Sequence, residues 1–424
     1  MSGLHVKYLL VGGGVASSAA AAAIRRHDRD GAILLVGQEV NRPYNRPLLS
    51  KDYLLGKTPR SALFTHIDDW FADNRAELRT GRRAARLDAP RRTVTLDSGE
   101  DVAFDNLLIA TGATAKHLNV PGAELPNVFY LRTLDDADRL HNAIEKAKNE
   151  GRRHEHGRGR VAIIGASLLG VELAATLRQI GLGVDLILAA AHPWRKYAGE
   201  NAGRFLTRYL ESLGIKVHTQ TVALRLEGDG RVQRVVLSDG AALDVDFVIG
   251  AVGINPNKDL LRGTSISAEK AILVDEHCRT SDAGIYAAGD CAAVLDPLFG
   301  KYRHIDHWES AMTTGAIAGA NMAGASESYS TVNRFYSELA GLRATMWGEA
   351  RLVERRIVRG NANVENPDFL EIGVAADGRV SQILAFNHKG EDELLAEIVR
   401  RRLSVDNIES ELRDPSVALS TLLT

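Results

Sequence analysis

Two glycine-containing stretches of the chain have the spacing of phosphate-binding loops. Residues 8–17 read YLLVGGGVAS and residues 161–170 read VAIIGASLLG. In such a loop, a glycine after a buried strand permits a tight turn, and a second small residue lets a pyrophosphate approach the backbone. The helix that follows offers free N–H groups and partial positive charge to the phosphates. The sequence therefore predicts two sites for dinucleotides, the second of them altered.

The first loop has the pattern G-x-G-x-x-S, formed by Gly12, Gly14 and Ser17. A Cβ at Gly14 would collide with a pyrophosphate, and Ser17 is small enough for the helix to pack on the strand. Glu39 stands where an acid about 20 residues beyond the glycines binds a ribose hydroxyl. We expect the supporting elements at residues 6–11 (strand), 15–26 (helix) and 32–37 (strand).

Length and composition bound the remaining possibilities. The chain has 424 residues, too many for one core, so we expect two or three domains. A net charge of −2 gives no basic field for nucleic acid. The two cysteines, Cys278 and Cys291, cannot build a disulfide framework or a metal site alone, which is typical of a reducing, cytoplasmic compartment. The apolar run 8–24 passes through three glycines, so we expect no signal peptide and no membrane insertion.

Three further stretches favour a flavin in the first site by resemblance. They are RPYNRPLLSKDYL (42–54), DNLLIATGA (105–113) and TSDAGIYAAGDCA (280–292). With them, nearly the whole chain resembles the FAD-dependent pyridine nucleotide-disulfide oxidoreductase superfamily. Within it, the chain is most similar to the ferredoxin/rubredoxin reductase branch, which includes monodehydroascorbate reductase and apoptosis-inducing factor.

The resemblance implies an α/β fold with two Rossmann-like dinucleotide-binding domains and a C-terminal α+β interface domain. It divides the chain into a discontinuous FAD domain (1–118 and 280–330), a linker with the NAD(P)H domain (119–279) and the interface domain (331–424). In the last of these, residues 349–358, 368–376 and 380–388 have the composition of strands, and residues 391–403 are expected to form an amphipathic helix.

The resemblance also implies which residues bind FAD. Arg46 and Lys51 match side chains that reach the pyrophosphate and the flavin ring, and Asp290 matches the residue that holds the ribityl chain. Tyr336 stands where the family usually has tryptophan. The full set is Gly12, Gly14, Val15, Ala16, Gln38, Glu39, Arg46, Lys51, Ala84, Thr111, Gly112, Arg132, Asp290, His307, Trp308 and Tyr336.

Some of these residues have an alternative structural interpretation. An aspartate after a glycine at a strand end is also a common helix N-cap, which is the alternative for Asp290. Considered without their flanking motifs, Trp308 and Tyr336 would be taken for core aromatics.

The second loop departs from the family pattern for NAD(P)H. Ser167 replaces the middle glycine: its hydroxyl is able to donate to a phosphate, but its Cβ crowds the closest approach. Family members that use NADH place a Glu near Leu188 or Ala190, and none occurs in LAAAHPWRK (188–196). Arg195 and Lys196 follow and either accept a 2′-phosphate or are merely solvated. The second site therefore tolerates or prefers NADPH, or it binds nucleotide weakly. The residues expected to contact the nucleotide are Gly165, Ser167, Leu168, Gly170, Glu172, Arg195 and Gly253.

The resemblance implies that Lys51 and Glu172 are catalytic, forming a salt bridge beside the flavin atom that receives the hydride. No cysteine occurs in 42–54, so disulfide chemistry is excluded. The expected function is transfer of electrons from NADH or NADPH through FAD to a ferredoxin or rubredoxin, by a monomer or homodimer without a metal. Two alternatives stay open: a monodehydroascorbate- or quinone-type reductase, and a slow-turnover redox-sensing flavoprotein like apoptosis-inducing factor.

Overall fold

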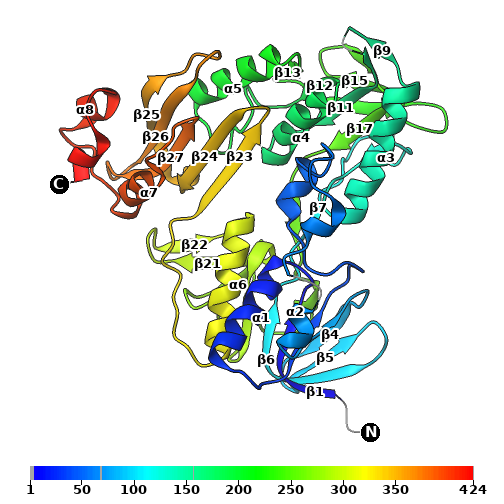
Figure 1. Ribbon diagram of the computed structural model, residues 1–424, viewed down its shortest axis with the longest axis vertical. Coiled ribbons are helices and arrows are strands. Elements are labelled where there is room, and N and C mark those ends of the chain that lie inside the picture. The colour runs from blue at the N-terminus through cyan, green and yellow to red at the C-terminus, as the bar shows by residue number, and fades with distance from the viewer. Residues whose placement is uncertain (1–3, 67–68, 156, 424) are drawn as a thin grey trace. The chain divides into compact units, whose positions relative to one another are not determined.

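The computed structural model describes residues 4–66, 69–155 and 157–423 (Figure 1). The chain divides into two compact units, each built from three stretches of sequence. Unit 1 comprises Met1–Pro47, Pro59–Thr114 and Ile254–Asn333. Unit 2 comprises Leu48–Thr58, Ala115–Gly253 and Arg334–Thr424.

Unit 1 is organised around a sheet of order β3-β2-β1-β6-β5-β4. Strand β20 also pairs with β6, along residues 107–109 at the end of that strand. Strands β3, β2, β1, β6 and β20 are parallel, whereas β4 and β5 form an antiparallel extension. The strands of this sheet are β1 (Leu4–Val11), β2 (Ile33–Val36), β3 (Ala76–Arg79), β4 (Ala84–Asp88), β5 (Thr93–Leu96), β6 (Asp101–Ile109) and β20 (Ile285–Ala287). The apolar run of β1 forms the centre of the core, because Leu9 and Leu10 are fully buried.

Two helices of unit 1, α1 (Val15–His27) and α6 (Trp308–Met322), lie side by side (Figure 1). They approach closely through small residues: a Cβ at Gly315 would overlap the carbonyl oxygen of Ala16. The alanine-rich sequence of α1 thus serves helix packing. Further elements of unit 1 are α2 (Trp70–Asp73), β18 (Ile254–Pro256), β19 (Ile272–Val274), β21 (Ala292–Asp296) and β22 (Lys301–Arg303). Strand β7 (Ala113–Ala115) includes the last two residues of the second stretch of unit 1 and the first residue of the second stretch of unit 2.

Unit 2 contains a second parallel sheet, of order β13-β12-β11-β17-β8. Its strands are β8 (Val128–Phe129), β11 (Arg160–Ile164), β12 (Gly183–Ile187), β13 (Lys216–His218) and β17 (Phe247–Gly250). Helix α4 (Leu168–Gln179) connects β11 to β12, and α3 (Leu134–Glu150) begins with a capping box at Thr133. Short hairpins complete this part: β9 (Arg153–His154), β10 (Gly157–Arg158), β14 (Ala223–Glu227), β15 (Arg234–Leu237) and β16 (Ala242–Asp244).

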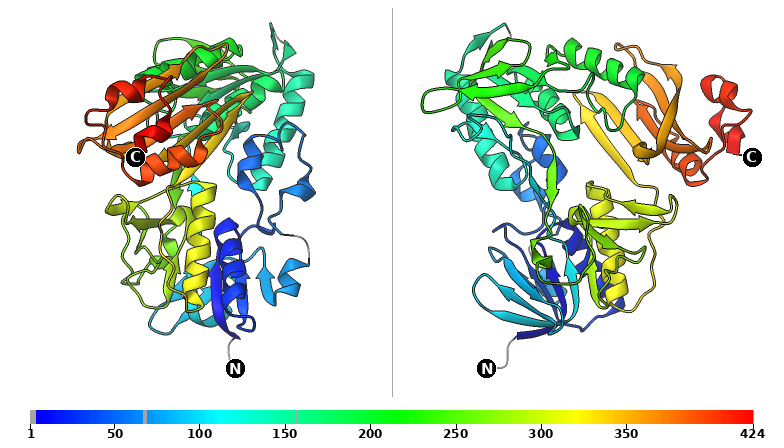
Figure 2. Two further views of the ribbon diagram at one scale, coloured as in Figure 1. Left: turned by 60° about the vertical axis from the view of Figure 1, so that its left-hand side comes forward. Right: turned by 180° about the vertical axis from the view of Figure 1, so that it is seen from behind.

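The C-terminal part of unit 2 is an antiparallel sheet of order β23-β24-β27-β26-β25. It consists of β23 (Arg334–Leu339), β24 (Leu342–Gly348), β25 (Val353–Asn361), β26 (Asp368–Ala375) and β27 (Val380–Phe386), followed by α7 (Asp392–Arg400) and α8 (Glu409–Arg413). Helix α5 (Glu200–Ser212) lies along this sheet (Figure 2), with the rings of Phe205 and Phe369 4.9 Å apart. The buried carboxylate of Glu371 accepts hydrogen bonds from the backbone N–H groups of Gly199 and Ala202 and so caps α5.

The two strands and the helix expected around the first loop lie within a few residues of their observed bounds. In the C-terminal segment, residues 349–352 differ from the expected strand, since a 3-10 turn (Ala350–Leu352) precedes β25. Residues 1–3, 67–68, 156 and 424 of the expected domains lie outside the described residues. The division into FAD, NAD(P)H and interface domains stays a prediction. Within the described chain, no helix combines the length and apolar character needed to cross a bilayer.

Candidate functional site

The two glycine loops occupy equivalent positions in their sheets. The N–H of Gly12 donates to the carbonyl oxygen of Val36 at 2.8 Å, and that of Gly165 donates to Ile187 at 2.8 Å. Both glycines have positive φ, +137° and +109°. A Cβ at either would overlap a carbonyl oxygen of the adjacent strand end, Ala110 for Gly12 and Ala251 for Gly165. These positions require glycine for the turn.

The loops differ at the second position, where phosphate is expected. A Cβ added to Gly14 would meet no atom within 4 Å, so the space beside this backbone is open. Gly14 is the N-cap of α1 and supplies no side chain to the first N–H groups of the helix. This open space at a helix N-terminus fits a pyrophosphate, and Val15 and Ala16 begin the helix there. The residues present therefore suit a dinucleotide in unit 1.

Ser167 is the N-cap of α4, and its hydroxyl already has two protein partners. The hydroxyl donates to the carbonyl oxygen of Ala251 at 3.1 Å and accepts from the N–H of Gly170 at 3.4 Å. A Cβ at Gly170 would overlap Gly165 and separate the helix from the loop. The expected donation from Ser167 to a phosphate would require its hydroxyl to leave Ala251, so that role stays a prediction.

Acidic and basic side chains meet beyond β2. Glu39 accepts hydrogen bonds from Arg46 at 2.9 Å and from Tyr44 at 2.6 Å, one on each carboxylate oxygen. A carboxylate has about four acceptor sites, so Glu39 retains capacity for ribose hydroxyls. Burial acts to lower the pKa of Arg46, but Tyr44, Glu39 and Asp290 raise it above its ordinary value. Arg46 therefore stays cationic and lies within electrostatic reach of Asp290. Tyr44 was not singled out from the sequence, although it stands in the RPYNRP stretch.

Two further predicted residues, Thr111 and Gly112, are held in place by hydrogen bonds with Asn257. Thr111 donates from its hydroxyl to the carbonyl oxygen of Asn257 at 2.7 Å, and the Asn257 amide donates back to Thr111 at 2.9 Å. The backbone of Gly112 accepts from Asn257 at 2.9 Å. Asn257 was missed from the sequence, and its signal was the INPN end of residues 247–257. It fixes the Thr111-Gly112 turn from a distant part of the chain.

Asp290 lies inside a 3-10 turn (Gly289–Cys291) whose N-cap is Ala288. The N-cap alternative for Asp290 is therefore wrong for this turn. Its backbone carbonyl oxygen lies 2.8 Å from Nε2 of His304, which fixes the turn beside the stretch that leads into α6.

The start of α6 supplies the last predicted group of unit 1. His307 is the N-cap and Trp308 is the first helical residue. The indole N–H of Trp308 is buried and has no hydrogen-bond partner. A buried, unpartnered donor is uncommon, so Trp308 has unused capacity for an acceptor. Gln38 is exposed after β2, and Ala84 is half-buried at the first position of β4.

In unit 2, Glu172 on α4 is the centre of a buried polar cluster. Its carboxylate lies 2.7 Å from the Lys51 ammonium. It also accepts hydrogen bonds from the hydroxyls of Ser50 at 2.8 Å and Ser337 at 2.7 Å. The predicted Lys51–Glu172 salt bridge is present, and the two serines that support it were missed from the sequence. These three close donors hold the Glu172 carboxylate in one position.

The other predicted residues of unit 2 lie on separate elements. Arg132 precedes α3, and its backbone N–H donates to Asp136 at 3.1 Å. The side chain of Tyr336 on β23 is 54% exposed, with the Arg343 guanidinium 6.0 Å from its ring centroid. Interpretation of Tyr336 as a core aromatic is therefore wrong. Gly253 has φ of +105° and accepts from the N–H of Lys116, whereas Leu168 begins α4.

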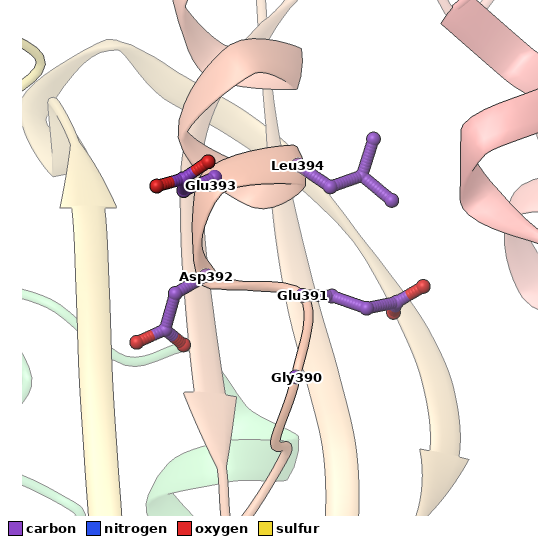
Figure 3. Close-up of a pocket in the computed structure, with 5 residues that line it drawn as sticks. All are labelled: Gly390, Glu391, Asp392, Glu393 and Leu394. Carbon is purple, nitrogen blue, oxygen red and sulfur yellow. The ribbon is translucent and has the colours of Figure 1, made fainter.

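A surface hollow elsewhere in unit 2 lies at the start of α7, lined by Gly390–Leu394 (Figure 3). Two of its three acids have protein partners: Glu391 lies 2.7 Å from His388, and Asp392 lies 3.2 Å from Arg343. These pairs stabilise the C-terminal sheet and make the hollow a poor candidate for nucleotide. Among the described residues, no group of three or more acidic, histidine or cysteine side chains is arranged to hold a metal ion.

Comparison with known proteins places this geometry in a family. Residues 6–315 match the family model described as pyridine nucleotide-disulphide oxidoreductase. The chain is 30% identical to the biphenyl dioxygenase system ferredoxin–NAD(+) reductase component of Paraburkholderia xenovorans, over 96% of this chain and 97% of that protein. It is 32% identical to rhodocoxin reductase of Rhodococcus erythropolis, over 84% and 81%.

The fold has a solved counterpart over its whole length. The ferredoxin reductase for the CYP199A2 system from Rhodopseudomonas palustris aligns with a TM-score of 0.90 and 28% identity, covering 99% of this chain and all of that one. The expected α/β class with two Rossmann-like parts is therefore confirmed.

Proposed function

We propose that this chain, which belongs to the pyridine nucleotide-disulphide oxidoreductase family, passes electrons from a nicotinamide nucleotide through FAD to a ferredoxin- or rubredoxin-type acceptor. The chain is an oxidoreductase, and its family uses FAD and a pyridine nucleotide. The single observation that carries the proposal is the open space at Gly14, which suits a pyrophosphate, in a chain whose relatives are ferredoxin and rhodocoxin reductases.

Bound FAD supplies the conversion of a two-electron hydride into single electrons. The chain's own residues bind and orient it: α1 presents N–H groups to the pyrophosphate, Glu39 binds the ribose, and cationic Arg46 neutralises phosphate charge. We assign the ribityl contact to Asp290. The assignments of Glu39, Arg46 and Asp290 are supported by the hydrogen bond between Arg46 and Glu39 and by the electrostatic interaction of Arg46 with Asp290.

Lys51 and Glu172 are proposed to act at the hydride-accepting edge of the flavin. The Lys51 ammonium is held in place by its ion pair with Glu172. A fixed cation stabilises negative charge that develops nearby during reduction. Ser50 and Ser337 hold Glu172 in place and so orient Lys51.

Steady-state and single-turnover measurements test the proposal. NADH or NADPH added to the purified yellow protein without oxygen should bleach the flavin, and an added ferredoxin should restore the colour rapidly. A flavin that neither nucleotide bleaches would overturn the proposal. Bleaching without reoxidation by ferredoxin or rubredoxin, but with rapid reoxidation by a quinone, would favour the small-acceptor alternative. Very slow turnover with either nucleotide would favour a redox-sensing role.

Sulfur is expected to take no part in this electron transfer. Cys278 and Cys291 are unpaired and fully buried, and burial raises the pKa of both thiols. We therefore expect the native protein to keep its turnover after treatment with iodoacetamide, and to show no thiol reaction with Ellman's reagent until it is unfolded. Loss of activity in step with alkylation of the native protein would contradict this expectation. The two unpaired cysteines also support the proposal of a cytoplasmic location.

A further inference from the structure

The two βαβ units of this chain provide an internal standard for the adenosine end of the nucleotide. Val36 and Ile187 are equivalent because each is the last residue of its strand and accepts the hydrogen bond of the loop glycine. Counting from these residues, Glu39 in the first unit corresponds to Ala190 in the second. The first site therefore has a ribose carboxylate, and the second has a methyl group in the same place.

The segment after β12 has cationic rather than acidic character. Residues 188–199, LAAAHPWRKYAG, contain no Asp or Glu. The first acid beyond them, Glu200, forms an ion pair with Arg204 on the surface of α5. Ala189 and Ala191 are exposed and Ala190 is half-buried, so the end of this strand is lined by small side chains. A ribose bound here would find room at its 2′ position and no carboxylate to repel a phosphate.

Arg195 follows a residue whose backbone is hydrogen-bonded to the second glycine loop. Trp194 is 2% exposed and has φ of +57°, and its N–H donates to the carbonyl oxygen of Ala166 at 3.1 Å. Packing of its ring, 6.5 Å from Phe335 and 6.4 Å from Phe386, fixes this turn. Arg195, the next residue, is exposed.

Arg195 also lies near a second guanidinium. Burial is the main cause that lowers the pKa of Arg356, and the nearby positive charge of Arg195 lowers it further. Arg356 forms an ion pair with Glu371 at 2.9 Å. Arg195 is exposed and forms no ion pair with another described residue, so its charge is available to an anion. By contrast, the Lys196 ammonium lies 5.1 Å from the ring centroid of Tyr197 and 3.2 Å from its hydroxyl.

We propose that Ala190 and Arg195 make this chain select a nicotinamide nucleotide with a 2′-phosphate, NADPH, over NADH. The inference rests on the proposed function for the assignment of the second loop to the nicotinamide nucleotide. With Ala190 at this position, no carboxylate is present there to repel a 2′-phosphate. Arg195 supplies a guanidinium that is able to bind the 2′-phosphate through two parallel N–H groups. The preference arises at the adenosine end and leaves hydride transfer unchanged.

Calorimetric titration of the FAD-loaded protein with 2′,5′-ADP and with 5′-ADP tests the proposal without any electron transfer. These fragments differ in the 2′-phosphate, and neither reduces flavin. We expect 2′,5′-ADP to bind roughly tenfold more tightly, the effect of one charge-assisted contact. Equal or weaker binding of 2′,5′-ADP, or no binding of either fragment, overturns the proposal.

Variants assign the effect to the two residues. Arg195→Gln should remove the advantage of 2′,5′-ADP, whereas the matched charge control Lys196→Gln should change the ratio of the two affinities by less than about threefold. Ala190→Glu should reverse the ratio in favour of 5′-ADP. An Arg195→Gln variant that retains the wild-type ratio overturns the role of Arg195. Fragment binding with the expected ratio, but no flavin bleaching by NADPH, would instead remove the proposed function and leave the specificity in place.

Discussion

Replacement of Gly14 by valine is expected to give a folded protein that purifies without its yellow cofactor. The space beside Gly14 is open, since an added Cβ meets no atom within 4 Å. Its φ of −98° and ψ of −175° are extended values that valine adopts readily. The equivalent residue of the second loop, Ser167, already carries a Cβ in nearly the same conformation. The added methyl groups would occupy the pyrophosphate position and weaken FAD binding by roughly a hundredfold or more.

The measurement is the ratio of flavin to protein after purification and after reconstitution with FAD. Gly12→Val is the matched control for damage to the fold, because its Cβ would overlap Ala110 and its φ is +137°. That variant should lose both flavin and thermal stability, whereas apo Gly14→Val should unfold near the temperature of the wild-type apoprotein. A Gly14→Val protein that retains stoichiometric FAD would show that the pyrophosphate lies elsewhere.

The arrangement of the two loops could be predicted because it depends on short-range order. A buried strand, a glycine, a small-residue loop and a helix follow one another within about 20 residues, and local sterics then decide the turn. The helix expected at 15–26 is observed at Val15–His27 for this reason. The strands expected in the C-terminal segment were likewise found at β25, β26 and β27, since alternating or continuous apolar runs survive as strands.

Features that depend on distant residues could not be predicted from such patterns. Ser50 and Glu172 are 122 residues apart in sequence yet 2.8 Å apart in the structure. The segment Leu48–Thr58 also belongs to unit 2, although the residues on both sides of it belong to unit 1. The Lys51–Glu172 pair was inferred only by resemblance, and no periodicity identifies the serines that complete it.

Local contacts of single residues were also beyond the reach of the sequence patterns. The Ser167 hydroxyl is able to donate to a phosphate, but in the structure it accepts from the helix as an N-cap and donates to Ala251, so its role toward phosphate stays a prediction. Tyr336 was ambiguous because aromatic residues at strand positions are usually buried. Side chains on a strand point alternately to its two faces, and Phe335 and Ser337 on β23 are buried, so Tyr336 between them is exposed.

Removal of the positive charge of Lys51 from the Lys51–Glu172 pair is expected to slow flavin reduction strongly. Lys51→Met would leave the Glu172 carboxylate buried with only the hydroxyls of Ser50 and Ser337. An unpaired buried charge destabilises a protein by about 3 kcal/mol or more, so this variant should also unfold more easily. Loss of the fixed cation should lower the rate of flavin bleaching by NADPH or NADH roughly a hundredfold, the scale of a lost electrostatic contact in a transition state. Stopped-flow absorbance of the flavin gives the rate.

The double variant Lys51→Met/Glu172→Gln separates catalysis from stability. It contains neither buried charge, and the side-chain amide introduced by Glu172→Gln retains a carbonyl oxygen to accept from Ser50. Its N–H₂ group is able to donate to Ser337, because a serine hydroxyl accepts as well as donates. The thermal stability of the double variant should therefore return most of the way to that of the wild type, because replacing a buried ion pair by neutral groups is often tolerated. Its bleaching rate should stay at the level of Lys51→Met, since the cation is still missing. If the rate recovered together with the stability, Lys51 would have only a structural role, and the electrostatic contribution assigned to it would have to come from another group.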